Sequence, residues 1–291
     1  MSYDVRVVAP AKINIGLRVL PVREDGYHGI ESVFQRIPFY DILYVEQTDC
    51  TGFNCIVNCE GIDLPKDNTL VLAHSAFCKI ANVAGSVSVC LEKHIPAGAG
   101  LGGGSSDAAA LVDALERIHN VFLSWQDRMR IASMVGSDVF FFLCPEAMEL
   151  GCAVVSGRGE KIEPFSVRQD LFFVLVCPEI HSSTKEAYQL VDGCCAPEWL
   201  WSGPDFLSLV EEYNKDVRAW TFVNSFEKPL AKCFPQIKCA LQDLEDVGAL
   251  YTQMSGSGSA VFGVFDSCAT ADNAAFVLRK KWKRCYVFAS A

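Results

Sequence analysis

Residues 96–107 read Pro96-Ala97-Gly98-Ala99-Gly100-Leu101-Gly102-Gly103-Gly104-Ser105-Ser106-Asp107. Five of the seven residues from 98 to 104 are glycine, so backbone N–H groups can approach an anion without interference from Cβ atoms. An alternating strand pattern precedes the stretch, and a helical pattern with Leu111, Leu115 and Ile118 on one face follows it. We expect Ser105 or Ser106 to cap this helix, whose N-terminus adds partial positive charge. The stretch therefore predicts a phosphate-binding loop.

Other phosphate-binding motifs fit this loop poorly. Gly98, Gly100 and Gly103 match the dinucleotide pattern G-x-G-x-x-G, but position 123, where an acidic residue is expected, is leucine. A P-loop requires Gly-Lys-Ser/Thr, and no lysine follows these glycines. The His-Arg-Asp and Asp-Phe-Gly motifs of protein kinases do not occur. A flexible glycine linker is the simplest alternative, but a linker would not join a strand to an amphipathic helix.

The composition limits the class of protein. The chain has 291 residues, a formal net charge of −10 and 51% hydrophobic residues, which suits one large or two modest domains. This acidity disfavours nucleic acid or an anionic membrane surface as a partner. We recognise no signal peptide and no membrane-spanning run. The 14 cysteines show no Cys-x-x-Cys spacing, so we expect reduced, buried thiols in a cytoplasmic protein.

Apolar patterns predict strands and helices in both halves of the chain, which indicates an α+β or α/β protein. Strands are expected at 5–9, 13–19, 37–46, 86–91, 171–177, 260–265 and 285–288, with a break at Ala9-Pro10-Ala11. Helices are expected at 70–80, 125–134, 186–191, 206–213, 232–245 and 271–282. Charged and turn-forming residues near 158–164 indicate a boundary between domains 1–157 and 158–291.

Three segments together resemble the motifs of the GHMP kinase superfamily. The glycine-rich loop resembles the second motif, Ala9-Pro10-Ala11-Lys12-Ile13-Asn14 the first, and Ser255-Gly256-Ser257-Gly258-Ser259-Ala260 the third. The stretches 23–28 and 136–142 narrow the resemblance to one branch. That branch uses ATP and Mg²⁺ to phosphorylate the 2-hydroxyl of a cytidine diphosphate-linked methylerythritol in non-mevalonate isoprenoid biosynthesis. Ala99, Ser137 and Phe140 depart from its usual residues, but no catalytic group is lost.

The resemblance implies a two-domain α+β fold. The N-terminal domain, 1–157, would bind ATP and contain a left-handed βαβ unit, an exception to the usual hand. The C-terminal domain, 158–291, would be ferredoxin-like. The active site would lie in the cleft between the domains.

The resemblance also implies the catalytic residues. Asp138 would be the base that takes the proton of the acceptor hydroxyl, and Lys12 would be its partner. A lysine close to the aspartate would keep the carboxylate ionised. Without the resemblance, Asp138 would suit a helix cap beside Gly136 equally well. A lysine such as Lys12 is most often a solvated charge, although its place between Ala11 and Ile13 in an apolar stretch favours a buried functional lysine.

Substrate and nucleotide contacts follow from the same resemblance. Tyr27 and His28 would hold cytidine, because an aromatic ring can stack on the base and histidine can bond its edge in either tautomer. Asn14, Thr184 and Tyr188 are further candidates, and Gly256 and Gly258 would shape the diphosphate site or simply form a turn. The expected ATP contacts are Asn68 and Lys93 at the adenine or ribose, and Pro96, Gly98, Gly100, Leu101, Gly102, Gly103, Gly104, Ser105 and Ser106 in the glycine-rich loop. Asp107 is expected to face outward or to act on the metal indirectly, and the metal ligands are not identified.

Two other functions remain open on the sequence. The chain could be a GHMP kinase for homoserine, mevalonate or a sugar, although Tyr27 and His28 favour a cytidine substrate. It could also be a non-catalytic nucleotide-binding module, although Lys12 and Asp138 are both present. In each case we expect a small-molecule partner and a monomer or weak homodimer.

Overall fold

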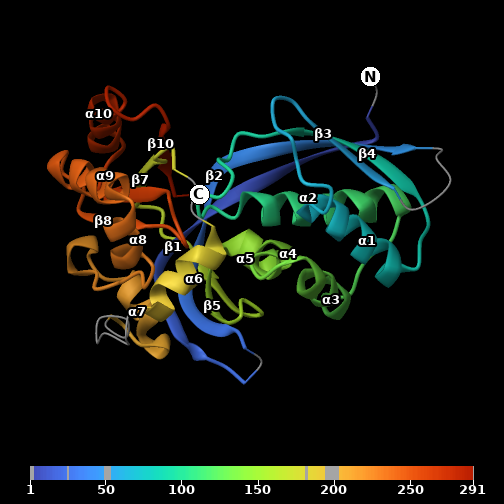
Figure 1. Cartoon of the computed structure of the whole chain (residues 1–291), viewed down its shortest axis with the longest axis horizontal. Coiled ribbons are helices and arrows are strands. Elements are labelled where there is room, and N and C mark those ends of the chain that lie inside the picture. The colour runs from blue at the N-terminus through green and yellow to red at the C-terminus, as the bar shows by residue number, and fades with distance from the viewer. Residues whose placement is uncertain (1–2, 25, 49–53, 181–182, 194–202, 291) are drawn as a thin grey trace. The chain divides into compact units, whose positions relative to one another are not determined.

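The computed structural model describes residues 3–24, 26–48, 54–180, 183–193 and 203–290 (Figure 1). The chain forms two compact units that interleave along the sequence. Unit 1 comprises residues 1–11, 39–95 and 102–149, and unit 2 comprises 12–38, 96–101 and 150–291. The expected domain boundary at 157/158 stays a prediction, because each unit is built from separate stretches of chain.

Two long strands begin the fold. β1 (Val5–Val22) pairs with β2 (His28–Thr48), and β2 then pairs antiparallel with β5 through Ile30–Gln35 and with β4 through Ile42–Thr48. The predicted break at Pro10 is wrong, because β1 is continuous. β1 lies outside the path of the other strands, and proline is tolerated on a strand edge that needs no N–H donor.

Unit 1 contains the expected βαβ unit. β3 (Cys55–Cys59) lies parallel to β4 (Ser86–Glu92), and α1 (Thr69–Ala81) connects them; the hand of the crossover stays a prediction. Leu111 and Leu115 on α2 are buried, as their spacing predicts. The further helices of this region are α2 (Gly103–His119), α3 (Trp125–Val135), α4 (Val139–Leu143) and α5 (Pro145–Leu150).

The expected ferredoxin-like sheet is present in unit 2. Its strands are β7 (Phe172–Val176), β8 (Tyr251–Met254), β9 (Val261–Phe265) and β10 (Cys285–Ala289), paired antiparallel in the order β10-β7-β9-β8. The accompanying helices are α6 (Thr184–Gly193), α7 (Leu209–Tyr213), α8 (Glu227–Cys233), α9 (Pro235–Asp246) and α10 (Cys268–Leu278). α9 and α10 pack against strands of this sheet.

A hairpin occupies the stretch that the sequence suggested was loose. β5 (Gly151–Gly157) pairs antiparallel with β6 (Lys161–Ser166), and the turn between them lies at 158–160. The charged residues of β6 alternate with half-buried ones, so the strand reads as a polar loop in the sequence.

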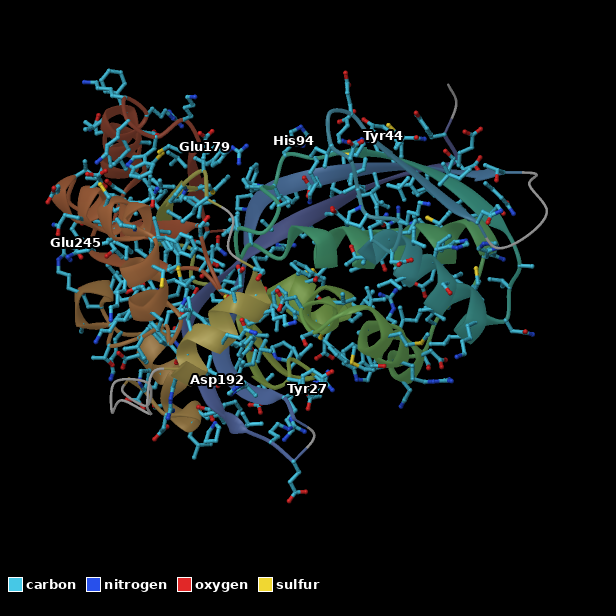
Figure 2. The ribbon with its side chains drawn as sticks, in the orientation of Figure 1. Tyr27, Tyr44, His94, Glu179, Asp192 and Glu245 are labelled. Carbon is cyan, nitrogen blue, oxygen red and sulfur yellow. The ribbon has the colours of Figure 1, made fainter. Side chains whose placement is uncertain are left out.

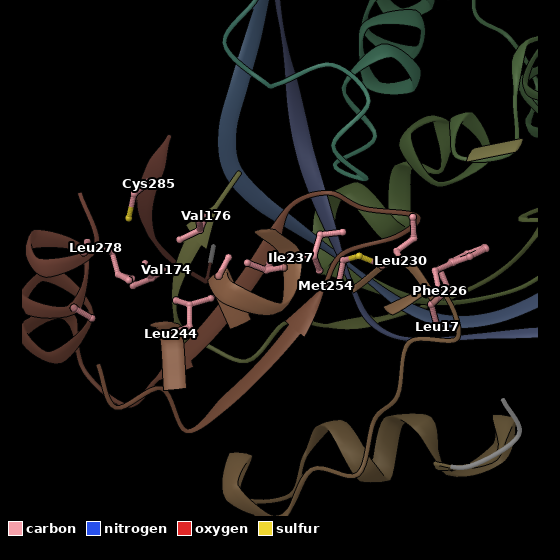
Figure 3. Close-up of a cluster of buried hydrophobic side chains, with 14 of the residues drawn as sticks. Leu17, Val174, Val176, Phe226, Leu230, Ile237, Leu244, Met254, Leu278 and Cys285 are labelled. Carbon is pink, nitrogen blue, oxygen red and sulfur yellow. The ribbon is translucent and has the colours of Figure 1, made fainter. Parts of the chain in front are cut away.

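The core of unit 2 combines residues that are far apart in sequence (Figure 3). Val174 and Val176 of β7 pack with Ile237 and Leu244 of α9, and Leu17 of β1 joins the same cluster. Each fully buried aliphatic side chain stabilises the fold by about 1.5–3 kcal/mol. The stretch 12–38 therefore contributes Leu17 and Val19 to the hydrophobic core of unit 2.

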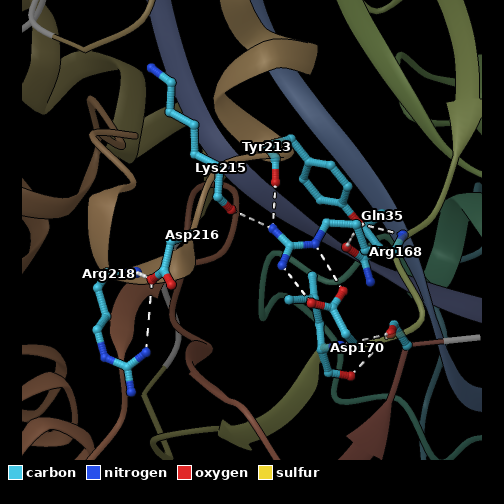
Figure 4. Close-up of polar contacts among 9 residues, drawn as sticks. Gln35, Arg168, Asp170, Tyr213, Lys215, Asp216 and Arg218 are labelled. Atoms are coloured by element: carbon cyan, nitrogen blue, oxygen red, sulfur yellow. Dashed lines mark hydrogen bonds and ion pairs between the residues drawn. The ribbon is translucent and has the colours of Figure 1, made fainter.

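Arg168 fastens the chain after α7 (Figure 4). Its guanidinium forms a two-point pair with Asp170 at 2.9 and 2.7 Å, and donates to the carbonyl oxygens of Tyr213 and Lys215 at 2.8 and 2.7 Å. The buried Tyr213 hydroxyl donates to Gln35 at 3.0 Å. Because guanidinium presents five donors in one plane, a single side chain holds this irregular segment in place.

In the described ranges, no helix combines the length and the hydropathy needed to cross a bilayer. The described cysteines are free thiols, and burial raises the pKa of Cys55, Cys152 and Cys177 to about 12. These three thiols therefore behave as small hydrophobic side chains. Cys233 and Cys268 are exposed, so the expectation of buried thiols is wrong for those two.

Candidate active site

The glycine-rich loop has the backbone that its composition predicts. Gly98, Gly100 and Gly102 have φ values of 66°, 76° and 70°, a region that favours glycine. The expected serine cap is wrong, because Gly102 is the N-cap of α2 and no side chain caps the helix. Ser105 and Ser106 lie inside the helix, past the capping position. Pro96–Leu101 belongs to unit 2 and Gly102–Ser106 to unit 1.

The unit 1 half of the loop leads into α2, whose first N–H groups have no partner within the helix. A Cβ on Gly103 would lie 2.8 Å from Lys93 Nζ, so only glycine fits there without displacing the lysine. Thr69 Oγ1 donates to the carbonyl oxygen of Gly104 at 2.8 Å. The Ser106 hydroxyl is buried and has no hydrogen-bond partner in the described part of the chain. This helix start can therefore accept an anion.

Lys93 and two buried carboxylates lie beneath the helix start. Lys93 Nζ pairs with Asp41 Oδ2 and, at 2.9 Å, with Asp107 Oδ2. The prediction that Asp107 faces outward is wrong, because its side chain is buried. Burial raises the pKa of Asp107 to about 7, Lys93 opposes the rise, and Asp41 adds to it.

A cavity of about 630 Å³ lies in unit 1 beside Asn68. Val57, Leu64 and Pro65 give it apolar walls, and Asn58 lies on the same lining. The Asn68 side chain accepts from the N–H groups that start α1 and donates to the Pro65 carbonyl oxygen at 2.9 Å. Asn68 therefore shapes the cavity, and its contact with a nucleotide stays a prediction.

Lys12 and Asn14 come together in unit 2, because residues two apart on β1 face the same side. Lys12 is 3% exposed, its Nζ donates to Asn14 Oδ1 at 2.5 Å, and the Phe34 ring centroid lies 4.6 Å away. Asn14 Nδ2 donates to the Ser32 hydroxyl at 3.0 Å. The lysine is thus buried and held in place by side-chain contacts.

The third motif packs against the unit 2 half of the glycine-rich loop. The Ser255 hydroxyl donates to the Gly100 carbonyl oxygen at 3.0 Å and accepts from Asn14 N–H at 3.1 Å. Ala260 N–H donates to the Ala99 carbonyl oxygen at 3.1 Å. Ser255 therefore links the first, second and third motifs.

Two residues that the sequence analysis missed hold the third motif from behind. Asn224 Nδ2 donates to the carbonyl oxygens of Met254 and Gly256 at 2.7 and 2.8 Å, and Glu227 accepts from Met254 N–H at 2.7 Å. Their signal, Asn224-x-x-Glu227 at the start of α8, resembles an ordinary helix start. Asn224 Oδ1 does accept from Phe226 N–H at 2.9 Å, as at a helix start, but the same side chain and Glu227 also fix the loop that carries Gly256.

Replacing Glu227 with glutamine should change how stability depends on pH. Burial raises the pKa of Glu227 to about 7 from its ordinary value of 4.5, so the folded state binds more protons than the unfolded state between these pH values. The stability that Glu227 contributes through its raised pKa is fully present below pH 4.5 and is lost as pH rises through 7. Relative to the variant, the wild type should lose roughly 1–3 kcal/mol between pH 4.5 and pH 8. Urea unfolding at several pH values measures this, with exposed Glu179→Gln as control (Figure 2). Parallel profiles for wild type and Glu227→Gln would contradict it.

The candidate cytidine residues lie in unit 2. The His28 and Tyr188 rings stack with centroids 5.2 Å apart, so they form one aromatic wall. His28 Nδ1 donates to the Leu20 carbonyl oxygen at 2.7 Å, and its Nε2 lies 3.0 Å from Asp192 Oδ1 on α6. Tyr27 is 54% exposed, and the Arg158 guanidinium lies 3.7 Å from its ring centroid (Figure 2).

Thr184 and Asp138 complete the predicted residues. The Thr184 hydroxyl lies 3.1 Å from the Ser257 hydroxyl, which places the start of α6 beside the third motif. Asp138 is the N-cap of α4 in unit 1 and is half-buried, and it makes no capping hydrogen bond. Lys12 and Asp138 belong to different units, so their pairing stays a prediction.

Residues 68–146 match the GHMP kinases N terminal domain, and residues 209–284 match the GHMP kinases C terminal domain. Over 283 residues the chain is 38% identical to a 4-diphosphocytidyl-2-C-methyl-D-erythritol kinase of Treponema pallidum, with 95% of each chain covered. The enzyme of that name from Chlorobium limicola is 37% identical, with 95% and 94% covered.

Solved structures resemble the fold. A crystal structure of 4-(cytidine 5'-diphospho)-2C-methyl-D-erythritol kinase matches with a TM-score of 0.76 at 32% identity, covering 98% of each chain. A homoserine kinase from Cytophaga hutchinsonii matches with a TM-score of 0.75 at 18% identity, covering 100% of this chain and 95% of that one. The second likeness is evidence for the fold alone.

Proposed function

The chain belongs to the GHMP kinase family, and we propose that it transfers the γ-phosphoryl group of ATP to the 2-hydroxyl of 4-diphosphocytidyl-2-C-methyl-D-erythritol. The observation that carries this proposal is the 38% identity to an enzyme of that name over nearly the full length of both chains. The reaction would serve non-mevalonate isoprenoid biosynthesis. We further propose a cytoplasmic monomer or weak homodimer that binds small molecules, and neither nucleic acid nor a membrane.

In the proposed reaction the nucleotide lies on the glycine-rich loop. The N–H groups at the start of α2 bind the phosphates, and the residues from Pro96 to Ser106 shape the backbone around them. The 630 Å³ cavity beside Asn68 receives the adenine, because its walls combine apolar side chains with amides. Mg²⁺ supplies charge neutralisation when it is bound with ATP. No group of three or more His, Cys, Asp or Glu in the described residues could hold a metal, which favours phosphate oxygens and water as ligands.

Proton transfer is assigned to Asp138. Its carboxylate accepts the proton of the 2-hydroxyl as the oxygen attacks the γ-phosphorus. Lys12 supplies positive charge to the attacking oxygen, and its hydrogen bond to Asn14 fixes the direction in which its ammonium group points. Most of the catalysis then comes from positioning and charge stabilisation.

The cytidine end of the substrate is assigned to Tyr27, His28 and Tyr188. The exposed face of Tyr27 can stack on the base, and the stacked His28 and Tyr188 rings form a wall beside it. Asn14, Thr184, Gly256 and Gly258 would contact the sugar-alcohol and diphosphate parts.

Replacing His28 with alanine should raise the KM for the cytidyl substrate by about tenfold and change kcat much less, because His28 contacts a part of the substrate that does not react. Steady-state kinetics at saturating ATP measures this, with the exposed His94→Ala as a matched control (Figure 2). An unchanged KM with a collapsed kcat would instead assign His28 a direct role in the chemistry.

A coupled assay of ADP release tests the proposed function. The purified protein is given ATP, Mg²⁺ and one of four acceptors: the cytidyl substrate, mevalonate, homoserine or galactose. Release with the cytidyl substrate alone is expected. Release with a different acceptor would reject the cytidine site, and no release with any acceptor would favour a non-catalytic nucleotide-binding module.

A further inference from the structure

Lys93 was expected to contact the adenine or ribose, but its side chain is engaged elsewhere. It is 8% exposed, and its ammonium group pairs with the buried carboxylates of Asp41 and Asp107. Two of its three donors are therefore directed at protein oxygens. The Lys93 ammonium group therefore lies beneath the start of α2, where the glycine-rich loop ends.

Asp41, Lys93 and Asp107 connect the two stretches of unit 1 that flank the glycine-rich loop, namely the end of β4 and the start of α2. Asp41 Oδ1 accepts from the N–H groups of His94 and Ile95 at 2.6 and 2.8 Å, which fixes the chain that leads out of β4. Asp107 lies in the second turn of α2, and a Cβ on Gly103 at the start of that helix would lie 2.8 Å from Lys93 Nζ. The lysine therefore joins the end of β4 to the first turns of α2.

The environment makes this link sensitive to the loss of Lys93. Its ammonium lies against two carboxylates that have little access to solvent, and an uncompensated buried carboxylate is costly. Asp107 Oδ1 and the Ser106 hydroxyl are buried and have no hydrogen-bond partner in the described ranges. Lys93 thus anchors the first turns of α2, and the same turns carry buried polar atoms that remain available for hydrogen bonds.

We propose that Lys93 is a positioning residue that, through Asp41 and Asp107, holds the first turns of α2 in place for the triphosphate of the nucleotide. This inference rests on the ATP-dependent function proposed above. In this proposal Lys93 supports the binding of the phosphates and makes no contact with the nucleoside. Loss of Lys93 should therefore weaken the binding of any polyphosphate ligand by the same factor.

Titration calorimetry with ATP and with inorganic tripolyphosphate tests the proposal. In Lys93→Met both dissociation constants should rise by a common factor of about 10–100, while the KM for the cytidyl substrate stays within about twofold. The exposed Lys79→Met, at the end of α1, is the matched control and should leave both constants unchanged. A loss of ATP affinity without a loss of tripolyphosphate affinity would overturn the proposal, because Lys93 would then contact the nucleoside.

A double variant keeps the test valid if Lys93→Met unfolds. With all three groups ionised, Lys93→Met/Asp107→Asn restores the net charge of the cluster but lacks the lysine link. It should recover thermal stability and still bind tripolyphosphate weakly, whereas wild-type affinity in this variant would refute the proposal. Turnover of the wild type is read separately. A wild type that binds tripolyphosphate but never releases ADP would count against the proposed reaction and not against the role of Lys93.

Discussion

Replacing Asp138 with asparagine is expected to lower turnover by about 10²–10⁴-fold, the usual range for a positioned acid–base group. Asparagine has nearly the same shape but cannot accept a proton from the attacking hydroxyl. Asp138 makes no capping hydrogen bond, so the substitution should leave α4 intact. KM for ATP should change little, because the carboxylate acts on the acceptor.

Single-turnover kinetics and thermal unfolding measure the two parts of this prediction. Glu146→Gln, an exposed acid at the start of α5, is the matched control and should retain full activity. Near-normal turnover in Asp138→Asn would remove Asp138 as the base. A large fall in melting temperature would instead indicate that the carboxylate is structural.

Replacing Gly100 with alanine is expected to destabilise the protein by roughly 2–5 kcal/mol. Its φ of 76° costs an alanine about 1–2 kcal/mol. A Cβ there would lie 2.1 Å from the Ser255 carbonyl oxygen, and relieving such a backbone clash costs about 1–3 kcal/mol more. Turnover should fall as well, because the loop and the third motif must separate.

Gly104→Ala is the matched control in the same loop. A Cβ there would lie 3.4 Å from Thr69 Oγ1 in a helical backbone, so stability should stay the same or rise by up to about 1 kcal/mol. Urea unfolding of both variants makes the comparison. Equal midpoints for Gly100→Ala and wild type would mean that the loop can move away from Ser255.

Much of the fold was predictable because apolar periodicity reports burial directly. Leu111 and Leu115 identified α2, and continuous apolar runs identified β7 and β9. The predicted break at Pro10 was wrong, since proline interrupts a strand only where a neighbouring strand needs an N–H donor at that position. The β5–β6 hairpin was missed because β6 is polar on one face.

The candidate site was predictable where its residues are close in sequence. Lys12 and Asn14 are in contact because side chains two residues apart on a strand face the same side, and five clustered glycines predict a loop that can bind phosphate. The contact of Ser255 with Gly100 spans 155 positions and leaves no local pattern. Asp107 was expected to face outward because an inward carboxylate would repel the phosphates. Its buried partner Lys93, 14 positions earlier, instead compensates the charge of the buried carboxylate.

The interleaving of the two units has a consequence for synthesis on the ribosome. Leu17 and Val19 emerge early, but their core partners Phe226 and Leu230 are made near the end. The N-terminal strand must therefore wait for most of the chain before its apolar face is covered, so unit 2 completes late in translation. A fragment of residues 158–291 would lack that strand, and supplying residues 1–157 in the same cell should restore its solubility.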